Sequence, residues 1–276
     1  MFRVQPNLLS SLFPALAAFT VSPPAMKDLS DFLASNPPWR EGFLWSLSGR
    51  LSDKAHLDQV YEALLESSDP PTRRELASYL NRLIKNGRFS LAYEKWKQAM
   101  PPERRAADNL PYNGNFELPF DGLPFNWSAD PVPGAAVQVV GGEDGKGRAL
   151  RVQFSGARVQ FNVRQMTLLL PGRYRLAVRV KAENLRTIRG LWWRIFCAND
   201  TTNTLAQTAL VSGNLPWSDQ HVEFEVPPQG CEAQHLWLEL PARIASERQI
   251  EGQVWYQDIR ITPLGNQQVP SLSGVK

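Results

Sequence analysis

Three residues on one short segment carry side chains suited to binding a sugar. The segment LWWRIFC, residues 191–197, alternates in character, so Trp192, Arg194 and Phe196 share one face if it forms a β-strand. Aromatic rings stack on the apolar side of a pyranose ring, and neighbouring polar groups form hydrogen bonds with its hydroxyls. This segment therefore predicts part of a carbohydrate-binding surface.

A second segment adds a further aromatic residue. In HLWLEL, residues 235–240, the leucines take the buried face, which turns Trp237 and Glu239 outward. Arg158 and Gln160 also take outward positions and are candidate contacts. Large aromatic side chains on the outside of a sheet indicate either a binding groove or a surface that docks against the helical half. A third possibility is that the assumed alternation is shifted and the rings are buried.

Arginine is dense at the outward positions of the C-terminal half. The outward set comprises Arg158, Arg164, Arg173, Arg175, Arg179 and Arg194. Because the planar guanidinium binds a carboxylate through two parallel hydrogen bonds, we expect an acidic, uronate-bearing polysaccharide as the ligand. The alternative is that these arginines pair with Glu223, Glu225 and Glu239 across strands, where each pair contributes about 0.2 to 1 kcal/mol.

The two cysteines, Cys197 and Cys231, lie on segments that read as neighbouring strands. If the strand ending at Cys197 runs antiparallel to a strand starting near Gln234, Cys231 comes within bridging distance. We expect a disulfide, which would imply export from the cytoplasm. The alternative is two buried free thiols in a cytoplasmic protein.

The sequence offers little support for catalysis. Its histidines, His56, His221 and His235, show no metal-ligand spacing, and no GxSxG, P-loop or HExxH motif occurs. Acid pairs such as Glu223 with Glu225 are better explained as solvated charges than as the paired carboxylates of a glycosidase. We expect a protein that is not an enzyme.

The elements that must position these residues fall into two halves. A chain of 276 residues is long enough for two domains with separate cores.

The net charge of +3 disfavours nucleic acid as a partner, because phosphate binding needs a concentrated basic surface. An apolar run over residues 8–25 is interrupted by Pro14 and is too short to span a membrane, so we expect an amphipathic helix there in preference to a secretion signal.

Residues 1–108 show helical periodicity with short breaks. Apolar stripes with a break at NPPW, residues 36–39, predict short helices packed in pairs. The segment SDPPTRRE, residues 68–75, predicts the start of a further helix, capped by a serine or an aspartate. The clearest pair is a helix over 74–85, a turn at Asn86-Gly87-Arg88 and a helix over 89–100. Ala92 and Trp96 on the second helix, with a proline beyond, resemble the closing half of a tetratricopeptide repeat. That resemblance implies a protein-docking surface; the alternative is a helical spacer.

From Arg148 onward, apolar and polar residues alternate in runs separated by Gly, Pro and Asn. Such runs predict antiparallel strands with one buried face. Because no helical pattern interrupts them, we expect a two-sheet β-sandwich or jelly roll over residues 109–264, followed by a disordered tail over 265–276. The stretch 110–127 is expected to supply the first strand and first long loop, with Trp127 in the core.

This half resembles a carbohydrate-binding module of the galactose-binding, cellulase-associated jelly-roll type. The resemblance rests on an opening NGxFE and Trp, a GxYxL strand, a Trp leading to FxVP, and an aromatic last strand with a late acid. The matching residues are Asn113, Gly114, Phe116, Glu117, Trp127, Gly172, Tyr174, Leu176, Trp217, Phe224, Val226, Pro227, Val254, Trp255, Tyr256, Asp258, Ile259 and Ile261.

The resemblance also implies a structural calcium ion. In such modules an early glutamate, a late aspartate and backbone carbonyls bind the ion, and the matching residues here are Glu117 and Asp258. The family commonly has two adjacent acids in the last strand, whereas the first of these positions here is Gln257. The alternative is that these carboxylates cap turns or pair with an arginine such as Arg260.

Together these observations predict a non-catalytic glycan-binding protein. The sandwich would bind an acidic polysaccharide and the helical half would dock a protein partner, with exopolysaccharide assembly in the periplasm or outside the cell as the setting suggested by the domain pairing. The alternative is a protein interaction scaffold whose sandwich does not bind sugar.

Overall fold

The computed structural model describes residues 6–19, 22–50, 54–105 and 110–265. The chain forms two compact units, residues 1–105 and 106–276. The predicted disordered tail lies, apart from Gly265, outside the described residues. None of the helices described is long and apolar enough to cross a membrane.

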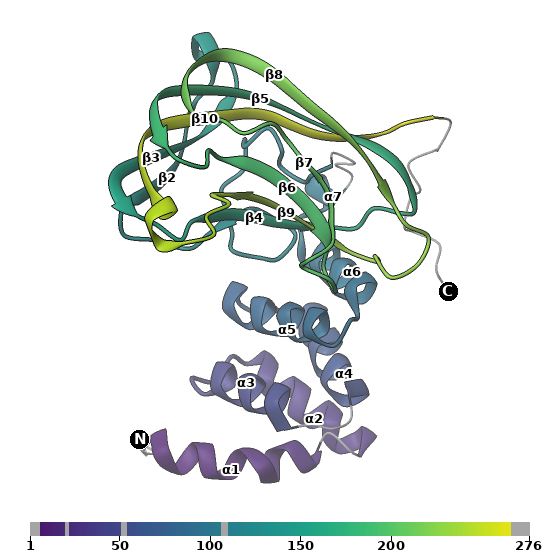
Figure 1. The fold of residues 1–276 in the computed structure, drawn as a ribbon. Coiled ribbons are helices and arrows are strands. Elements are labelled where there is room, and N and C mark those ends of the chain that lie inside the picture. The colour runs from purple at the N-terminus through teal and green to yellow at the C-terminus, as the bar shows by residue number, and fades with distance from the viewer. Residues whose placement is uncertain (1–5, 20–21, 51–53, 106–109, 266–276) are drawn as a thin grey trace. The chain divides into compact units, whose positions relative to one another are not determined.

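The first unit is helical (Figure 1). Its described helices are α1 (Pro6–Ala18), α2 (Pro23–Ala34), α3 (Arg40–Arg50), α4 (Lys54–Leu65), α5 (Arg73–Lys85), α6 (Phe89–Ala99) and the short α7 (Pro102–Arg105). α1 packs on α3 and α3 on α5, while α2 packs on α4 and α5 on α6. The predicted helical hairpins are confirmed, because contacts between alternate helices and between α5 and α6 are those of stacked hairpins. Tetratricopeptide ancestry stays a prediction.

The hairpin of α5 and α6 forms where the sequence predicts it. Gly87 supplies the positive φ of the turn, 73°, and Ala92 and Trp96 are buried on α6. The predicted cap of α5 is wrong by a few residues: Thr72 is the N-cap, and its side chain and that of Glu75 each accept a backbone hydrogen bond from the other. Pro70 and Pro71 precede the cap.

Arg40 and Glu75 form a buried ion pair at the centre of this unit. Nε of Arg40 lies 3.0 Å from Oε1 of Glu75, and the two side chains are 1% and 2% exposed. The Arg40 guanidinium also donates to the backbone oxygens of Leu33 and Asp69. Since Glu75 is also part of the α5 cap, the pair ties the start of α3 to the start of α5.

Replacing Arg40 with methionine is expected to lower the free energy of unfolding of the helical unit by about 3 to 5 kcal/mol, because it leaves the Glu75 carboxylate buried without its partner. Urea unfolding followed by helical circular dichroism measures this. The matched control is Arg74→Met, which breaks an exposed pair with Glu41 and is expected to cost less than about 1 kcal/mol. If both variants lost the same free energy of unfolding, the buried pair of Arg40 and Glu75 would contribute no more than an exposed pair.

The second unit is an antiparallel β-sandwich (Figure 1). Its described strands are β1 (Ser128–Ala129), β2 (Ala135–Gly141), β3 (Arg148–Arg158), β4 (Asn162–Thr167), β5 (Gly172–Thr187), β6 (Trp192–Cys197), β7 (Thr204–Gln207), β8 (Gly213–Val226), β9 (Gln234–Glu239) and β10 (Gln249–Pro263). They form sheet A, in the order β1-β4-β9-β6-β7, and sheet B, in the order β2-β3-β10-β5-β8. The predicted sandwich is confirmed.

The stretch 110–127 differs from its prediction, because it contains turns and loop and no strand, although the structure describes it throughout. It nevertheless lies along β10: the amides of Ile259 and Ile261 donate to the carbonyls of Gly114 and Leu110. A Cβ on Gly114 would lie 2.1 Å from the Ile259 oxygen, so this close approach requires glycine. The side chain of Asn113 satisfies both backbone groups of Leu118.

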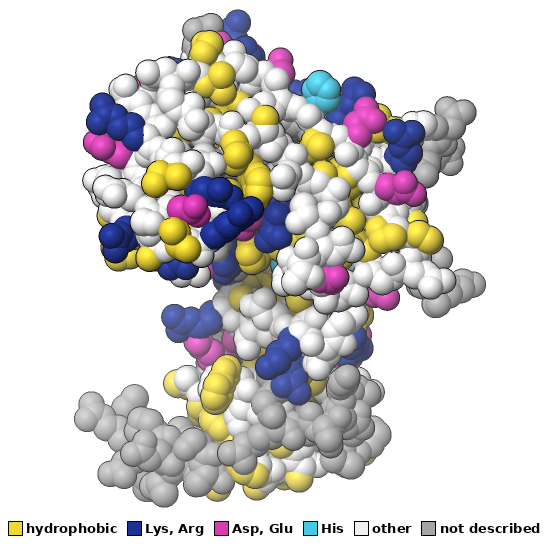
Figure 2. Space-filling view, viewed as in Figure 1, with side chains coloured by type: hydrophobic (Ala, Val, Ile, Leu, Met, Phe, Trp, Pro, Cys, Tyr) yellow, Lys and Arg dark blue, Asp and Glu magenta, His cyan; other side chains and the backbone are white. Residues whose placement is uncertain are grey.

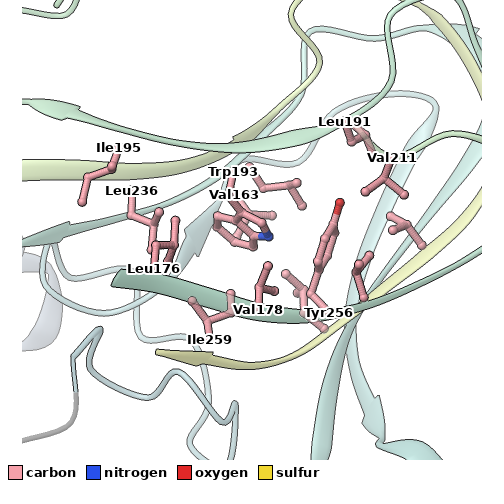
Figure 3. Packing of buried hydrophobic residues seen from close by; sticks show 14 of the residues in the cluster. Val163, Leu176, Val178, Leu191, Trp193, Ile195, Val211, Leu236, Tyr256 and Ile259 are labelled. Carbon is pink, nitrogen blue, oxygen red and sulfur yellow. The ribbon is translucent and has the colours of Figure 1, made fainter. Parts of the chain in front are cut away.

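Trp193 fills the space between the two sheets (Figure 3). It is fully buried, with its ring centroid 5.5 Å from those of both Trp127 and Tyr256. The predicted core position of Trp127 is therefore confirmed. Burying these three large rings between sheets A and B provides much of the apolar area that stabilises a sandwich of this size.

A disulfide joins Cys197, the last residue of β6, to Cys231, three residues before β9. The two strands pair antiparallel with Cys197 opposite Gln234, as expected. The Gln234 side chain supports the same corner, since its amide donates to the Cys231 oxygen and accepts from the backbone amide of Leu169. The disulfide predicted from strand placement is confirmed.

Removing this disulfide, by replacing both cysteines with alanine, is expected to lower the free energy of unfolding of the sandwich by about 3 to 4 kcal/mol, because the bond closes a loop between residues 34 positions apart. Urea unfolding followed by tryptophan fluorescence measures the loss. Dithiothreitol should reproduce it in the unmodified protein and have no effect on the alanine variant. A reductant effect that persists in the variant would show that another cause is at work.

Candidate functional site: the outer face of sheet A

The outer face of sheet A carries an ordered set of aromatic and polar side chains. Three adjacent strands, β4, β9 and β6, pair in register, so their outward residues form three rows across the sheet. The rows are Asn162, Glu239 and Trp192; Arg164, Trp237 and Arg194; and Met166, His235 and Phe196. We call these nine residues the sheet A array.

Glu239 links two of the predicted contact residues. Its Oε1 lies 2.7 Å from Nε of Arg194 and accepts a hydrogen bond of 3.3 Å from Nε1 of Trp192. The Arg194 and Glu239 side chains are only 17% and 18% exposed, so this ion pair is shielded from solvent. Their mutual contact therefore holds Trp192 and Arg194 in one orientation.

The aromatic rings of the array contact one another. The Phe196 ring lies edge-on to Trp237, at 5.0 Å between centroids, and 5.3 Å from His235. The Arg194 guanidinium lies 4.2 Å from the Phe196 centroid, within the range of a cation–π contact. Phe196 is buried, whereas Trp192 and Trp237 are partly exposed. The two tryptophans are therefore the rings available to a ligand, and Phe196 supports them.

Trp237 has an unsatisfied polar atom. Its Nε1 is shielded from solvent and has no hydrogen-bond partner among the described residues. A buried donor without a partner costs free energy in the folded protein. The residue lies between Arg164 and Arg194 in the central row of the array.

Arg164 is the more accessible of the two arginines in the array. It pairs with Asp130 at 2.8 Å, and the two side chains are 36% and 64% exposed. It also donates a hydrogen bond to the side-chain oxygen of Asn162. Because an exposed pair of this kind is worth about 0 to 1 kcal/mol, a ligand carboxylate can replace Asp130 at little cost.

Four of the six predicted sugar contacts meet in the array: Trp192, Arg194, Phe196 and Trp237. The other two do not join them. Arg158 ends β3 of sheet B, and Gln160 is exposed in the connection from β3 to β4.

Most of the outward arginines of the sandwich also lie elsewhere. Arg173 and Arg175 share Glu223 on sheet B, and Arg179 pairs with Glu143. Figure 2 shows basic and acidic side chains next to each other on the visible face of this unit. The alternative of cross-strand pairing thus holds for Arg173 and Arg175 with Glu223 and for Arg194 with Glu239.

The predicted calcium ligands lie on different segments. Glu117 is exposed and lies beside the loop that joins β2 to β3. Asp258 pairs with Arg260 at 3.2 Å, which is the alternative expected for this aspartate if it binds no metal. Within the described residues no three His, Cys, Asp or Glu side chains gather as metal ligands. The residues seen here do not fit a calcium site well, and the calcium site stays a prediction.

Sequence reasoning missed Asn162 and His235 as members of the site and did not group Arg164 with Trp237. The alternation of β4 and β9 contains the signal for the outward face, since Asn162 and Arg164 share a parity. What it lacks is the strand order, because only the pairing of β9 between β4 and β6 brings the three rows together.

Comparisons with known proteins give matches at the level of structure alone. No family model and no curated protein matches the sequence. Among solved structures, one described as "CBM4 structure and function" is 17% identical, covers 56% of this chain and 99% of its own, and gives a TM-score of 0.43. A family 16 carbohydrate-binding module is 21% identical over 56% of this chain and 99% of its own, with a TM-score of 0.39.

A third similar structure is a xylanase 10B fragment of Clostridium thermocellum, with CBM22-1 and GH10 modules, complexed with xylohexaose. It is 18% identical, covers 54% of this chain and 28% of its own, and gives a TM-score of 0.35. At these scores the fold of this chain rests on its own strand topology.

The pKa of His235 allows a test of the array. Burial, followed by the charges of Arg164 and Arg194, lowers the pKa of His235 from 6.5 to about 4. As the pH falls, His235 therefore binds a proton at a higher pH in the unfolded chain than in the folded protein. The free energy of unfolding is expected to be highest above pH 6.5 and to fall by about 3 kcal/mol as the pH drops to 4.

Urea unfolding of the sandwich between pH 7.5 and pH 4 measures this dependence. The variant His235→Asn should lose most of this slope, whereas His221→Asn, at an exposed position on β8, should keep it. A slope unchanged in His235→Asn would show that His235 is not the group responsible.

Proposed function

We propose that this protein binds glycans through the sheet A array and is not itself an enzyme. The observation that supports this is the central row, in which the partly exposed Trp237 lies on the strand between Arg164 and Arg194. A sugar ring needs an aromatic face for its apolar side and polar groups for its hydroxyls. Trp237 and Trp192 supply the faces, and Asn162 and Glu239 supply the hydrogen-bonding groups.

We propose further that the ligand is an acidic polysaccharide and that Arg164 is the residue that recognises its uronate groups. Arg194 is held by a shielded pair with Glu239, whereas the pair of Arg164 with Asp130 is exposed and weak. A uronate carboxylate that displaces Asp130 would form the bidentate contact that arginine favours. The proposed specificity for acidic ligands then depends on one residue, Arg164, and not on the general density of arginine.

The helical unit is proposed to dock a protein partner. A groove of about 450 Å³ lies in this unit and is lined by residues of α3, α4 and α5, among them Trp45, Tyr61 and Ser78. Trp45 is 73% exposed, which is unusual for a tryptophan without a partner surface.

The disulfide supports a periplasmic or extracellular location, because disulfides persist in oxidising compartments. Exopolysaccharide assembly is a setting compatible with both parts.

The alternative function is a protein interaction scaffold whose sandwich does not bind sugar. Phe196 favours this alternative, since it is fully buried although its strand position faces outward. An array in which Phe196, His235 and Trp237 pack on one another serves equally well as a surface for contact with protein.

Titration of the full chain with soluble neutral and uronate-bearing polysaccharides, followed by tryptophan fluorescence, distinguishes these functions. Binding is expected, and Trp237→Ala is expected to weaken it about five- to thirtyfold, because stacking on one ring contributes about 1 to 2 kcal/mol. The matched control is Trp255→Ala on sheet B, which should bind normally. A flat response to every polysaccharide would favour the scaffold.

The same titration tests the acidic specificity with Arg164→Met. This variant should bind uronate polysaccharides more weakly and neutral ones unchanged, and Arg175→Met on sheet B should resemble the unmodified protein. If Arg164→Met weakened neutral and acidic ligands equally, glycan binding would stand and the uronate specificity would not.

A further inference from the structure

Gln257 of β10 holds a loop that lies more than a hundred residues away in the sequence. Its Oε1 accepts a hydrogen bond of 3.2 Å from the Glu143 amide, and its Nε2 donates one of 3.1 Å to the Lys146 oxygen. Both partners belong to the loop GGEDGKG, residues 141–147, between β2 and β3. Gln257 is 9% exposed, so these hydrogen bonds are largely shielded from water.

The loop closes tightly around this amide. A Cβ on Gly142 would lie 2.8 Å from Nε2 of Gln257 and 2.2 Å from the Lys146 oxygen. A Cβ on Gly147 would lie 3.3 Å from the same Nε2 and 3.8 Å from Oε1 of Glu117. Glycine at both positions leaves room for the glutamine side chain, and Gly147 also adopts a positive φ of 63°.

The surrounding groups set the orientation of the Gln257 amide. Exchanging its oxygen and nitrogen would place two donors together at Glu143 and two acceptors together at Lys146. The Lys146 carbonyl therefore faces an N–H group. A calcium ion needs six to eight oxygen ligands, and this carbonyl is already occupied by an amide N–H group, which supplies none.

The expected aspartate does not compensate. Asp258 has a positive φ of 53°, at an irregularity in the pairing of β10 with β5, and its carboxylate pairs with Arg260. Glu117 thus stays as the single carboxylate of the predicted ligand set that flanks the loop. One carboxylate and an occupied carbonyl are a poor donor set for calcium.

We propose that the Gln257 amide takes the place of a cation between β10 and the loop 141–147, and that it stabilises the sandwich without metal. A neutral amide can satisfy an N–H and a carbonyl at the same time, whereas a metal ion satisfies only oxygen atoms. The cross-link between the last strand and the loop is thereby retained with hydrogen bonds alone.

Thermal unfolding of the full chain in EDTA and in millimolar Ca²⁺ tests the proposal without any variant. The melting temperature of the sandwich is expected to be the same in both. Gln257→Ala should lower it by about 3 to 6 °C in either condition, because two shielded hydrogen bonds are lost. The proposal would be overturned if Ca²⁺ raised the melting temperature of the unmodified protein, or if Gln257→Ala left the melting temperature unchanged.

The isosteric variant Gln257→Glu tests whether the amide occupies a position that suits a cation. It places a carboxylate oxygen against the Lys146 carbonyl, so the melting temperature should fall in EDTA and recover in Ca²⁺ but not in Mg²⁺. Adding Glu117→Gln should abolish the recovery, whereas adding Glu225→Gln, an exposed position on β8, should not. Failure of Ca²⁺ to restore Gln257→Glu would show that this is not a cation position.

Discussion

The packing of Trp193 between the two sheets determines which side chains lie on the outer face of sheet A. Side chains alternate along a strand, so burying Trp193 against Trp127 and Tyr256 turns Trp192 and Arg194 to the opposite face. A shift of one residue would bury an arginine and expose the core. The large cost of that arrangement fixes the register of β6 and, through pairing, the registers of β9 and β4. The candidate site is thus a consequence of the core.

Pairing with carboxylates accounts for many of the arginines in the described part of the chain. Arg40 is acceptable inside the helical unit only because Glu75 and backbone oxygens satisfy its donors. On sheet B, Glu223 serves two arginines at once. Within the sheet A array, Arg164 differs from Arg194 by its partial exposure and its exposed partner, so it is the arginine of the array that can exchange one carboxylate for another.

The opening NGNFE motif acts through contacts other than regular secondary structure. Asn113 and Gly114 do not begin a strand. Asn113 closes a loop through its side chain, and Gly114 allows the backbone to approach Ile259. The motif therefore specifies how the chain enters the sandwich and lies along β10, which local propensities for strand or turn do not express.

The sequence by itself determined the features that depend on neighbouring residues. Alternation identified most of the strands and their buried faces, and helical spacing identified the hairpin of α5 and α6, because both patterns are repeated within a few residues. Its failures were local as well: β1 and β2 have weak patterns and were not expected.

Only the tertiary structure decided which distant segments meet. It placed β9 between β4 and β6, assigned each arginine its partner, and brought Gln257 to Glu143 and Lys146. The physical reason is that pairing between strands and hydrogen bonds across loops are settled by the packing of the whole sandwich. Residues far apart in the chain carry no local signal of that choice.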